Sequence, residues 1–282
     1  MKKICVVLAI VLLATVLLSL IVTLVGRNMP IGEKVALVRI EGPIVSSRSA
    51  IEELRKYRKD SSVKAIVLRV DSPGGAVAPS QEIYEEVGKL LKIKPVVVSM
   101  GSVAASGGYY ISAPATKIYA NPGTVTGSIG VIMEIPNFKG LMDKVGIRTE
   151  VIKSGKHKDL ASVFRGIGKE ERAILQGVLD DVHDQFIRAV SEGRNIPYER
   201  VRKIADGRVF TGRQAKAEGL VDALGNIQDA IMEAARLGGI KGEPNVVSKK
   251  EKSSIFDLIS SRIPKELKEV FGTVSLKYLM YY

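Results

Sequence analysis

The sequence predicts an α/β protein built on a parallel sheet, with a membrane-spanning helix before it and a helical part after it. Three observations lead to this prediction. Short runs rich in Val and Ile alternate with amphipathic segments between residues 35 and 153, as in βαβ units with right-handed crossovers. An uncharged apolar run precedes that region, and a long segment with helical apolar spacing follows it.

The first half of the chain is expected to supply the sheet. Short runs rich in β-branched residues predict its strands. They lie at residues 35–40, 63–70, 95–100, 117–120, 129–133 and 148–153. Helices are predicted between them at 49–57, 80–92 and 138–145. Ser80 is expected to cap the second of these helices, and Ser106 to open a further one.

The second half is expected to be helical. Residues 169–194 are predicted to form one long amphipathic helix, because their apolar residues step by three and four. Shorter helices are predicted at 197–205, before Gly219, and at 226–237, where Asn226 is the expected cap.

The N-terminus predicts a membrane anchor. Residues 4–25 contain no charge, and these 22 residues would span about 33 Å as a helix, enough for a bilayer core of about 30 Å. No Ala-x-Ala pattern follows the run, which favours an uncleaved anchor over a removed signal peptide. Lys2 and Lys3 precede it and only Arg27 closely follows, so a single-pass protein of the cell membrane is predicted, with its body outside the cytoplasm.

The composition narrows the choice of partners. The chain carries 42 Lys and Arg against 30 Asp and Glu, a net charge of +12, yet it has no Trp and only 5% aromatic residues. No nucleic-acid partner is therefore predicted, and contact with anionic lipid headgroups accounts better for the charge. The chain has only two histidines, without His-x-x-x-His spacing, so no metal site is predicted. It also contains no Gly-x-x-x-x-Gly-Lys-[Ser/Thr] motif for binding phosphate, so no cofactor is predicted. The single cysteine, Cys5, excludes a disulfide within one chain.

One serine has the surroundings of a nucleophile. Ser106 follows the strand predicted at 95–100 and small residues, and it directly precedes Gly107 and Gly108. A tight turn there would present its hydroxyl, and the following amide could face an oxyanion. A Ser- and Gly-rich turn without catalytic function is the alternative interpretation.

Three further segments accompany this one: Asp71-Ser-Pro-Gly-Gly75, Thr126-Gly-Ser-Ile-Gly130 and Lys153-Ser-Gly-Lys-His-Lys-Asp159. In this order the four segments resemble the signal peptide peptidase A family of membrane-bound Ser/Lys proteases. The resemblance runs from about residue 35 to about residue 235, and the single set of motifs matches the short, single-unit form. It implies a ClpP/crotonase-like fold of repeated ββα units.

The resemblance also assigns roles to particular residues. It implies that Ser106 is the nucleophile, that Lys158 is the general base and that Ser128 orients the lysine. It implies that backbone amides stabilise the oxyanion. These belong to Gly74 or Gly75, and to Gly107.

The choice of base has consequences that can be checked. A lysine with a free pKa of about 10.4 is protonated at neutral pH, so Lys158 should be buried, Asp159 should point away from its amine, and activity should rise with pH. His157 is the rival base, since Asp159, two residues away, could orient it on a strand. His183 is expected to be structural.

Other residues of these segments have simpler expected roles. Ser102, Ser154 and Ser162 are alternative nucleophiles, but none is followed by a glycine pair. Asp71 is expected to accept backbone N–H groups of its own turn.

The family resemblance implies an enzyme that degrades residual signal peptides and other short or unfolded peptides through an acyl-enzyme. It also implies a homo-oligomeric ring or dome, in which the dyad could be completed across subunits. Two other functions remain open: a catalytically silent membrane scaffold with the same fold, and an acyl-CoA enzyme of the crotonase type.

The predicted organisation has four parts: an anchor at 1–27, a linker at 28–34, the protease domain at 35–240 and a tail at 241–282. The tail ends in a segment with three tyrosines, at 275–282. This segment is expected either to pack against the body or a neighbouring subunit, or to dock in the substrate groove or on the membrane.

Overall fold

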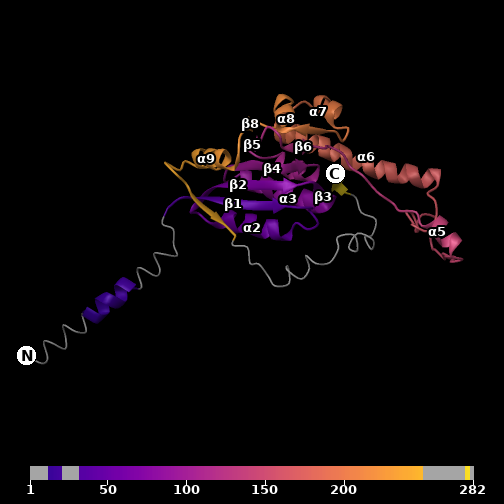
Figure 1. Cartoon of the computed structure of the whole chain (residues 1–282), viewed down its shortest axis with the longest axis horizontal. Coiled ribbons are helices and arrows are strands. Elements are labelled where there is room, and N and C mark those ends of the chain that lie inside the picture. Colours follow the sequence, from indigo (N-terminus) through magenta and orange to yellow (C-terminus); the bar gives the residue numbers. More distant parts are fainter. Residues whose placement is uncertain (1–11, 21–31, 250–276, 280–282) are drawn as a thin grey trace, which may run out of the picture.

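The computed structural model describes residues 12–20, 32–249 and 277–279. Most of its strands form one mixed, largely parallel sheet in the order β7-β6-β4-β2-β1-β9, with β5 paired to β4 and β8 (Figure 1). The strands are β1 (Lys34–Glu41), β2 (Val63–Ser72), β3 (Gly74–Ala76), β4 (Val96–Ala105), β5 (Lys117–Ala120), β6 (Val125–Gly127), β7 (Val209–Thr211), β8 (Ala223–Leu224), β9 (Asn245–Ser248) and β10 (Lys277–Leu279). The predicted α/β class with a mostly parallel sheet is confirmed.

The helices cover both faces of this sheet. They are α2 (Arg48–Lys59), α3 (Val77–Leu91), α4 (Gly107–Ser112), α5 (Lys139–Lys144), α6 (Lys169–Arg194), α7 (Tyr198–Ile204), α8 (Gly212–Ala217) and α9 (Ile227–Leu237). Strand β1 shows why the sheet needs two covers: Val35 and Leu37 pack in the cluster that contains α9, whereas Ala36 and Val38 pack in the larger core with α2 and α3. Both faces of the strand are therefore buried, as its continuous apolar run predicts.

Strand β4 changes partner half-way along its length. Its first half pairs in parallel with β5 and its second half with β6, and Val103 donates its N–H to Asp71 Oδ1 at 3.0 Å. Asp71 thus binds the second half of β4 rather than its own turn, so the role predicted for it was wrong. Strand β4 therefore ends beside β6, and Ser106 follows directly after its last residue.

Several predicted boundaries were wrong. Residues 129–133 and 148–153 form no named strand, and β6 lies at 125–127 instead. Helix α3 begins three residues before Ser80, which lies inside it and donates to Ala76 O at 2.9 Å. Asn226 caps α9 as predicted, since its side chain accepts the N–H groups of Gln228 and Asp229.

Helix α6 has the predicted bounds but only half of it lies on the body. Its C-terminal half buries Val182, Phe186 and Val190, while Ile174 and Val178 remain exposed. Residues 133–178, here called the arm, comprise α5, the following irregular segment and the first part of α6. Figure 1 shows α5 and the start of α6 projecting away from the sheet.

The predicted anchor is mostly outside the described residues. Helical residues 12–20 belong to it, and no helix in the described part of the chain is long and apolar enough to cross a membrane. Most of the tail predicted at 241–282 is likewise outside the described residues, apart from 241–249 and β10.

A buried lysine stabilises the end of α2. Lys94 is 8% exposed, and its Nζ donates to Tyr57 O and Asp60 O at 2.6 Å each. Lys94→Met should lower the free energy of unfolding by about 2 kcal/mol, because two carbonyls lose a charged donor. Lys92→Met, at an exposed neighbouring position, is the matched control in urea unfolding. Equal stability of both variants would contradict this role.

Candidate active site

Ser106 occupies a strained turn between a strand and a helix. It lies between β4 and α4 with φ 53° and ψ −118°, a region that side chains rarely adopt, and it is 1% exposed. Its N–H donates to Gly127 O at 2.8 Å, which ties the turn to β6. Such strain persists only where the surroundings over-determine the backbone, and it is common at functional sites.

Ser128 occupies the equivalent place on the neighbouring strand. Ala105 and Gly127 are paired in the parallel register of β4 and β6, and a serine follows each of them. Ser128 also has a positive φ, 50°, and donates its N–H to Arg208 O at 2.8 Å. Because both serines leave the same ends of adjacent parallel strands, the fold brings them together.

Three glycines meet beside this pair. A Cβ placed on Gly107 would lie 3.2 Å from Gly74 Cα and 3.2 Å from Gly75 N. It would also lie 2.7 Å from Ser80 Oγ, so no side chain fits there without displacing its surroundings. The close approach places the backbone amides of β3 next to the residue that follows Ser106.

The hydrogen bonds distinguish the two candidate donors on β3. Gly74 donates its N–H to Ser72 Oγ at 3.1 Å, and its carbonyl accepts from Ile44 N at 2.8 Å. Gly75 is therefore the better candidate for an oxyanion donor, together with Gly107. The sequence analysis missed Ser72, whose place inside the Asp71–Gly75 segment was its only signal.

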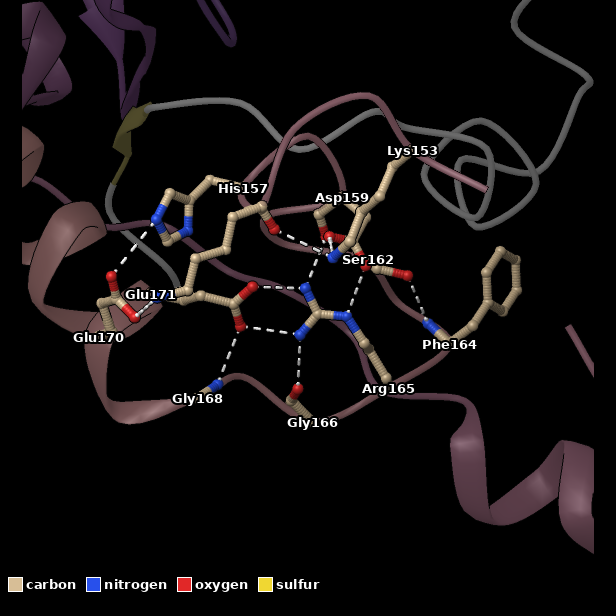
Figure 2. A network of polar contacts seen from close by, with 11 residues as sticks. Lys153, His157, Asp159, Ser162, Phe164, Arg165, Gly166, Gly168, Glu170 and Glu171 are labelled. Atoms are coloured by element: carbon tan, nitrogen blue, oxygen red, sulfur yellow. Dashed lines mark hydrogen bonds and ion pairs between the residues drawn. The ribbon is translucent and has the colours of Figure 1, made fainter. Parts of the chain in front are cut away.

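Lys158 does not lie in this cluster. Its side chain is exposed on the arm, between His157 and Asp159. Figure 2 shows that these two neighbours belong to a polar network at the start of α6. Glu171, a member of that network, lies eleven residues before Val182, the first apolar residue of α6 buried on the body, or about 16 Å along the helix. Within this chain, Lys158 is therefore neither buried nor beside Ser106.

The rival base has a different acidic neighbour from the one expected. His157 Nε2 lies 3.4 Å from Glu170 Oε1, whereas Asp159 accepts from Arg165 and Lys153. The sequence hypothesis of a His157/Asp159 pair therefore has no support in these contacts. His183, in α6, lines a cavity near Ser128.

That cavity opens beside Ser128 at the base of the arm. It has a volume of about 730 Å³. Its walls come from residues 128–132, from α6 and from residues 205–209, and they include Asp180 and Asp206. It is large enough to admit a lysine side chain from outside. Among the described residues, no cluster of three or more His, Cys, Asp or Glu side chains could hold a metal ion.

The C-terminal strand lies against the glycine-rich strand. β10 pairs antiparallel with β3, with Tyr278 opposite Gly75 and Leu279 opposite Gly74. Of the alternatives considered for the tail, packing against the body is met by this pairing, which lies beside the candidate oxyanion amides. The edge of β3 therefore accepts an extended chain through main-chain pairing.

Comparisons with known proteins find two family models and several relatives that match this chain. A model of peptidase family S49 matches residues 89–241, and a model of Clp protease matches residues 37–126. A protein of Synechocystis sp. provisionally named a protease is 45% identical over 209 residues, covering 74% of this chain and 76% of that protein. A similarly named protein of Methanocaldococcus jannaschii is 38% identical over 271 residues, covering 88% and 86%. The chloroplastic serine protease SPPA of Arabidopsis thaliana is 34% identical over 212 residues, covering 73% of this chain and 31% of its own.

Proposed function

Because the chain belongs to peptidase family S49, a family of serine proteases, we propose that Ser106 is its nucleophile in a Ser/Lys dyad. A lysine amine takes the hydroxyl proton while Oγ attacks the peptide carbonyl, and the amides of Gly75 and Gly107 stabilise the oxyanion. The proton then passes to the leaving amine. Water repeats the attack on the acyl-enzyme, which releases the carboxylic acid and restores Ser106.

The observation that carries this proposal is the juxtaposition at the ends of β4 and β6. A strained, buried Ser106 lies next to Ser128 and to a cluster of glycine amides. An ordinary turn has no need of two serines with positive φ at paired positions, whereas a nucleophile and a residue that orients its base do.

We further propose that the base, Lys158, comes from a second copy of the chain. Lys158 is exposed on the arm, and the cavity beside Ser128 is open to receive it. The arm cannot fold around a core of its own: within it, all of which is described, Glu171 is the only buried residue. A second copy is the fitting partner, because each copy has both an exposed Lys158 and a cavity beside Ser128.

The apolar surface of the arm supports the same assembly. Nine of its large apolar side chains are exposed, Ile152 to 97%. The others are Phe138, Leu141, Val145, Ile147, Val151, Phe164, Ile174 and Val178. Monomeric proteins rarely leave so many together, and head-to-tail contacts between identical chains close into rings. A ring or dome would restrict entry to short or unfolded peptides.

The proposed substrates are signal peptides left in the membrane and other extended apolar peptides. The uncharged residues 4–25 would anchor the enzyme in the cell membrane, with its body on the extracytoplasmic side beside anionic lipids. The pairing of β10 with β3 supports substrate binding as an added strand.

The test uses the full chain in liposomes with peptides of equal length. A leucine-rich signal-peptide segment should be cleaved at least about tenfold faster than a charged peptide, since burial of apolar side chains favours it. A folded protein should remain intact. Equal rates for the two peptides would contradict the proposed substrate class, while the protease assignment would stand.

A further inference from the structure

Arg165 joins an irregular loop of the arm to the start of helix α6. Its Nε donates to Asp159 Oδ2 at 2.8 Å and its Nη2 to Asp159 O at 3.1 Å. Its Nη1 donates to Glu171 Oε2 at 2.7 Å, and Nη2 also donates to Glu171 Oε1. Figure 2 shows the guanidinium between the two carboxylates. The side chain therefore fastens the loop at 153–165 to the first turn of α6.

The same loop is held at further points. Lys153 donates to Asp159 and to Lys156 O, and Glu171 also accepts the N–H of Gly168 at 3.0 Å. Ala161, within the loop, has φ 65°, a strained value for alanine. An exposed loop retains such strain only when its contacts over-determine it, so the network sets the conformation on both sides of Lys158.

We propose that Arg165 is a positioning residue for Lys158: by clamping Asp159 to Glu171, it presents the lysine in one orientation to Ser106 of the neighbouring copy. This inference rests on the proposed Ser/Lys dyad and deepens it. Asp159 is one residue from Lys158, so movement of its carboxylate displaces the lysine directly. Asp159 thus positions Lys158 through its contact with Arg165, and it does not bind the amine of Lys158.

The chemistry of the clamp requires an arginine. A planar guanidinium can donate to two carboxylates at once, whereas a lysine amine is a single point that cannot span them. Hydrogen bonds from Arg165 hold the pKa of Asp159 well below its usual range and lower that of Glu171 to about 2. A carboxylate whose pKa is lowered in the folded form stabilises that form at pH values above its ordinary pKa. The clamp therefore persists at neutral and alkaline pH and is lost only when acid protonates the two carboxylates.

The first test compares Arg165→Gln with Arg236→Gln in the full chain. Arg236 also binds a carboxylate, Glu233, but on α9 and away from the arm. Arg165→Gln should speed hydrogen exchange across residues 153–165 and lower kcat about 10²-fold with KM unchanged, since small misplacement of a reacting group has effects of that size. Arg165→Lys should fall between, and Arg236→Gln should match the parent. Unchanged exchange or unchanged kcat would overturn the proposal.

The second test asks which copy needs the clamp. Arg165→Gln is added either to the Ser106→Ala chain, which donates the lysine, or to the Lys158→Ala chain, which donates the serine, and the two chains are mixed. Activity of the mixture should fall only in the first case; equal loss in both would mean a general effect on assembly and would overturn the proposal. If mixtures without Arg165→Gln are inactive while the parent is active, the exchange of lysines between copies fails, and the kcat and hydrogen-exchange comparison still decides the clamp.

Discussion

Replacing Ser106 by alanine is expected to lower peptide hydrolysis by at least about 10³-fold, because loss of a nucleophile removes the acyl-enzyme route entirely. The change removes one oxygen and leaves the backbone free to keep φ 53°. The far-ultraviolet circular dichroism spectrum and the oligomer mass should therefore match those of the parent. Initial rates on a fluorogenic peptide measure the effect.

Two control variants make this result specific. Ser102→Ala, at an exposed position in β4, should keep the activity of the parent. Ser106→Gly should be as inactive as Ser106→Ala but no less stable, since glycine adopts the strained conformation that costs other residues about 1–3 kcal/mol. Substantial hydrolysis by Ser106→Ala would show that another group is the nucleophile.

Mixing the inactive Ser106→Ala and Lys158→Ala chains is expected to restore hydrolysis. If each site takes its serine from one copy and its lysine from the next, random assembly from equal amounts leaves about a quarter of the sites complete. Each variant alone should be at least about 10³-fold below the parent. The two chains are co-expressed with different tags, purified together and assayed at several ratios.

The same variants, together with His157→Ala, also distinguish the two candidate bases. His157→Ala should keep most of the activity by itself, because His157 faces Glu170 in the arm network. A mixture that stays inactive, with assembly confirmed by mass, would place both members of the dyad on one chain. An inactive His157→Ala variant with an active Lys158→Ala variant would instead indicate a Ser/His enzyme.

Much of the fold followed from local pattern. Strand β1 and helices α6 and α9 lie within one residue of the predicted bounds, because their apolar spacing matches the faces that they bury. The strands predicted at 129–133 and 148–153 were wrong for a tertiary reason: the first segment leads into the arm and the second lies within it, and neither forms a named strand in the described part of the chain. Intrinsic preference for a strand has little effect without a partner.

The candidate site divides in the same way. Four short segments and their resemblance to a known family identified Ser106, Ser128 and the glycines of β3 as candidates, because such segments are visible in the sequence alone. It could not distinguish Gly74 from Gly75, because that depends on Ser72 accepting one of the two amide protons. It also missed Arg165, whose partners lie on both sides of it along the chain and meet only in the folded arm.

The family, the class of fold and the residues proposed to carry the chemistry could thus be recognised from residue types and short motifs alone. How near these residues lie to one another depends on the tertiary structure. It brings Ser106 and Ser128 together through the parallel register of β4 and β6, and it leaves Lys158 on an arm that projects from the body. Spacing along a chain does not state which surfaces the chain leaves uncovered, and it is the uncovered arm that points to a second copy.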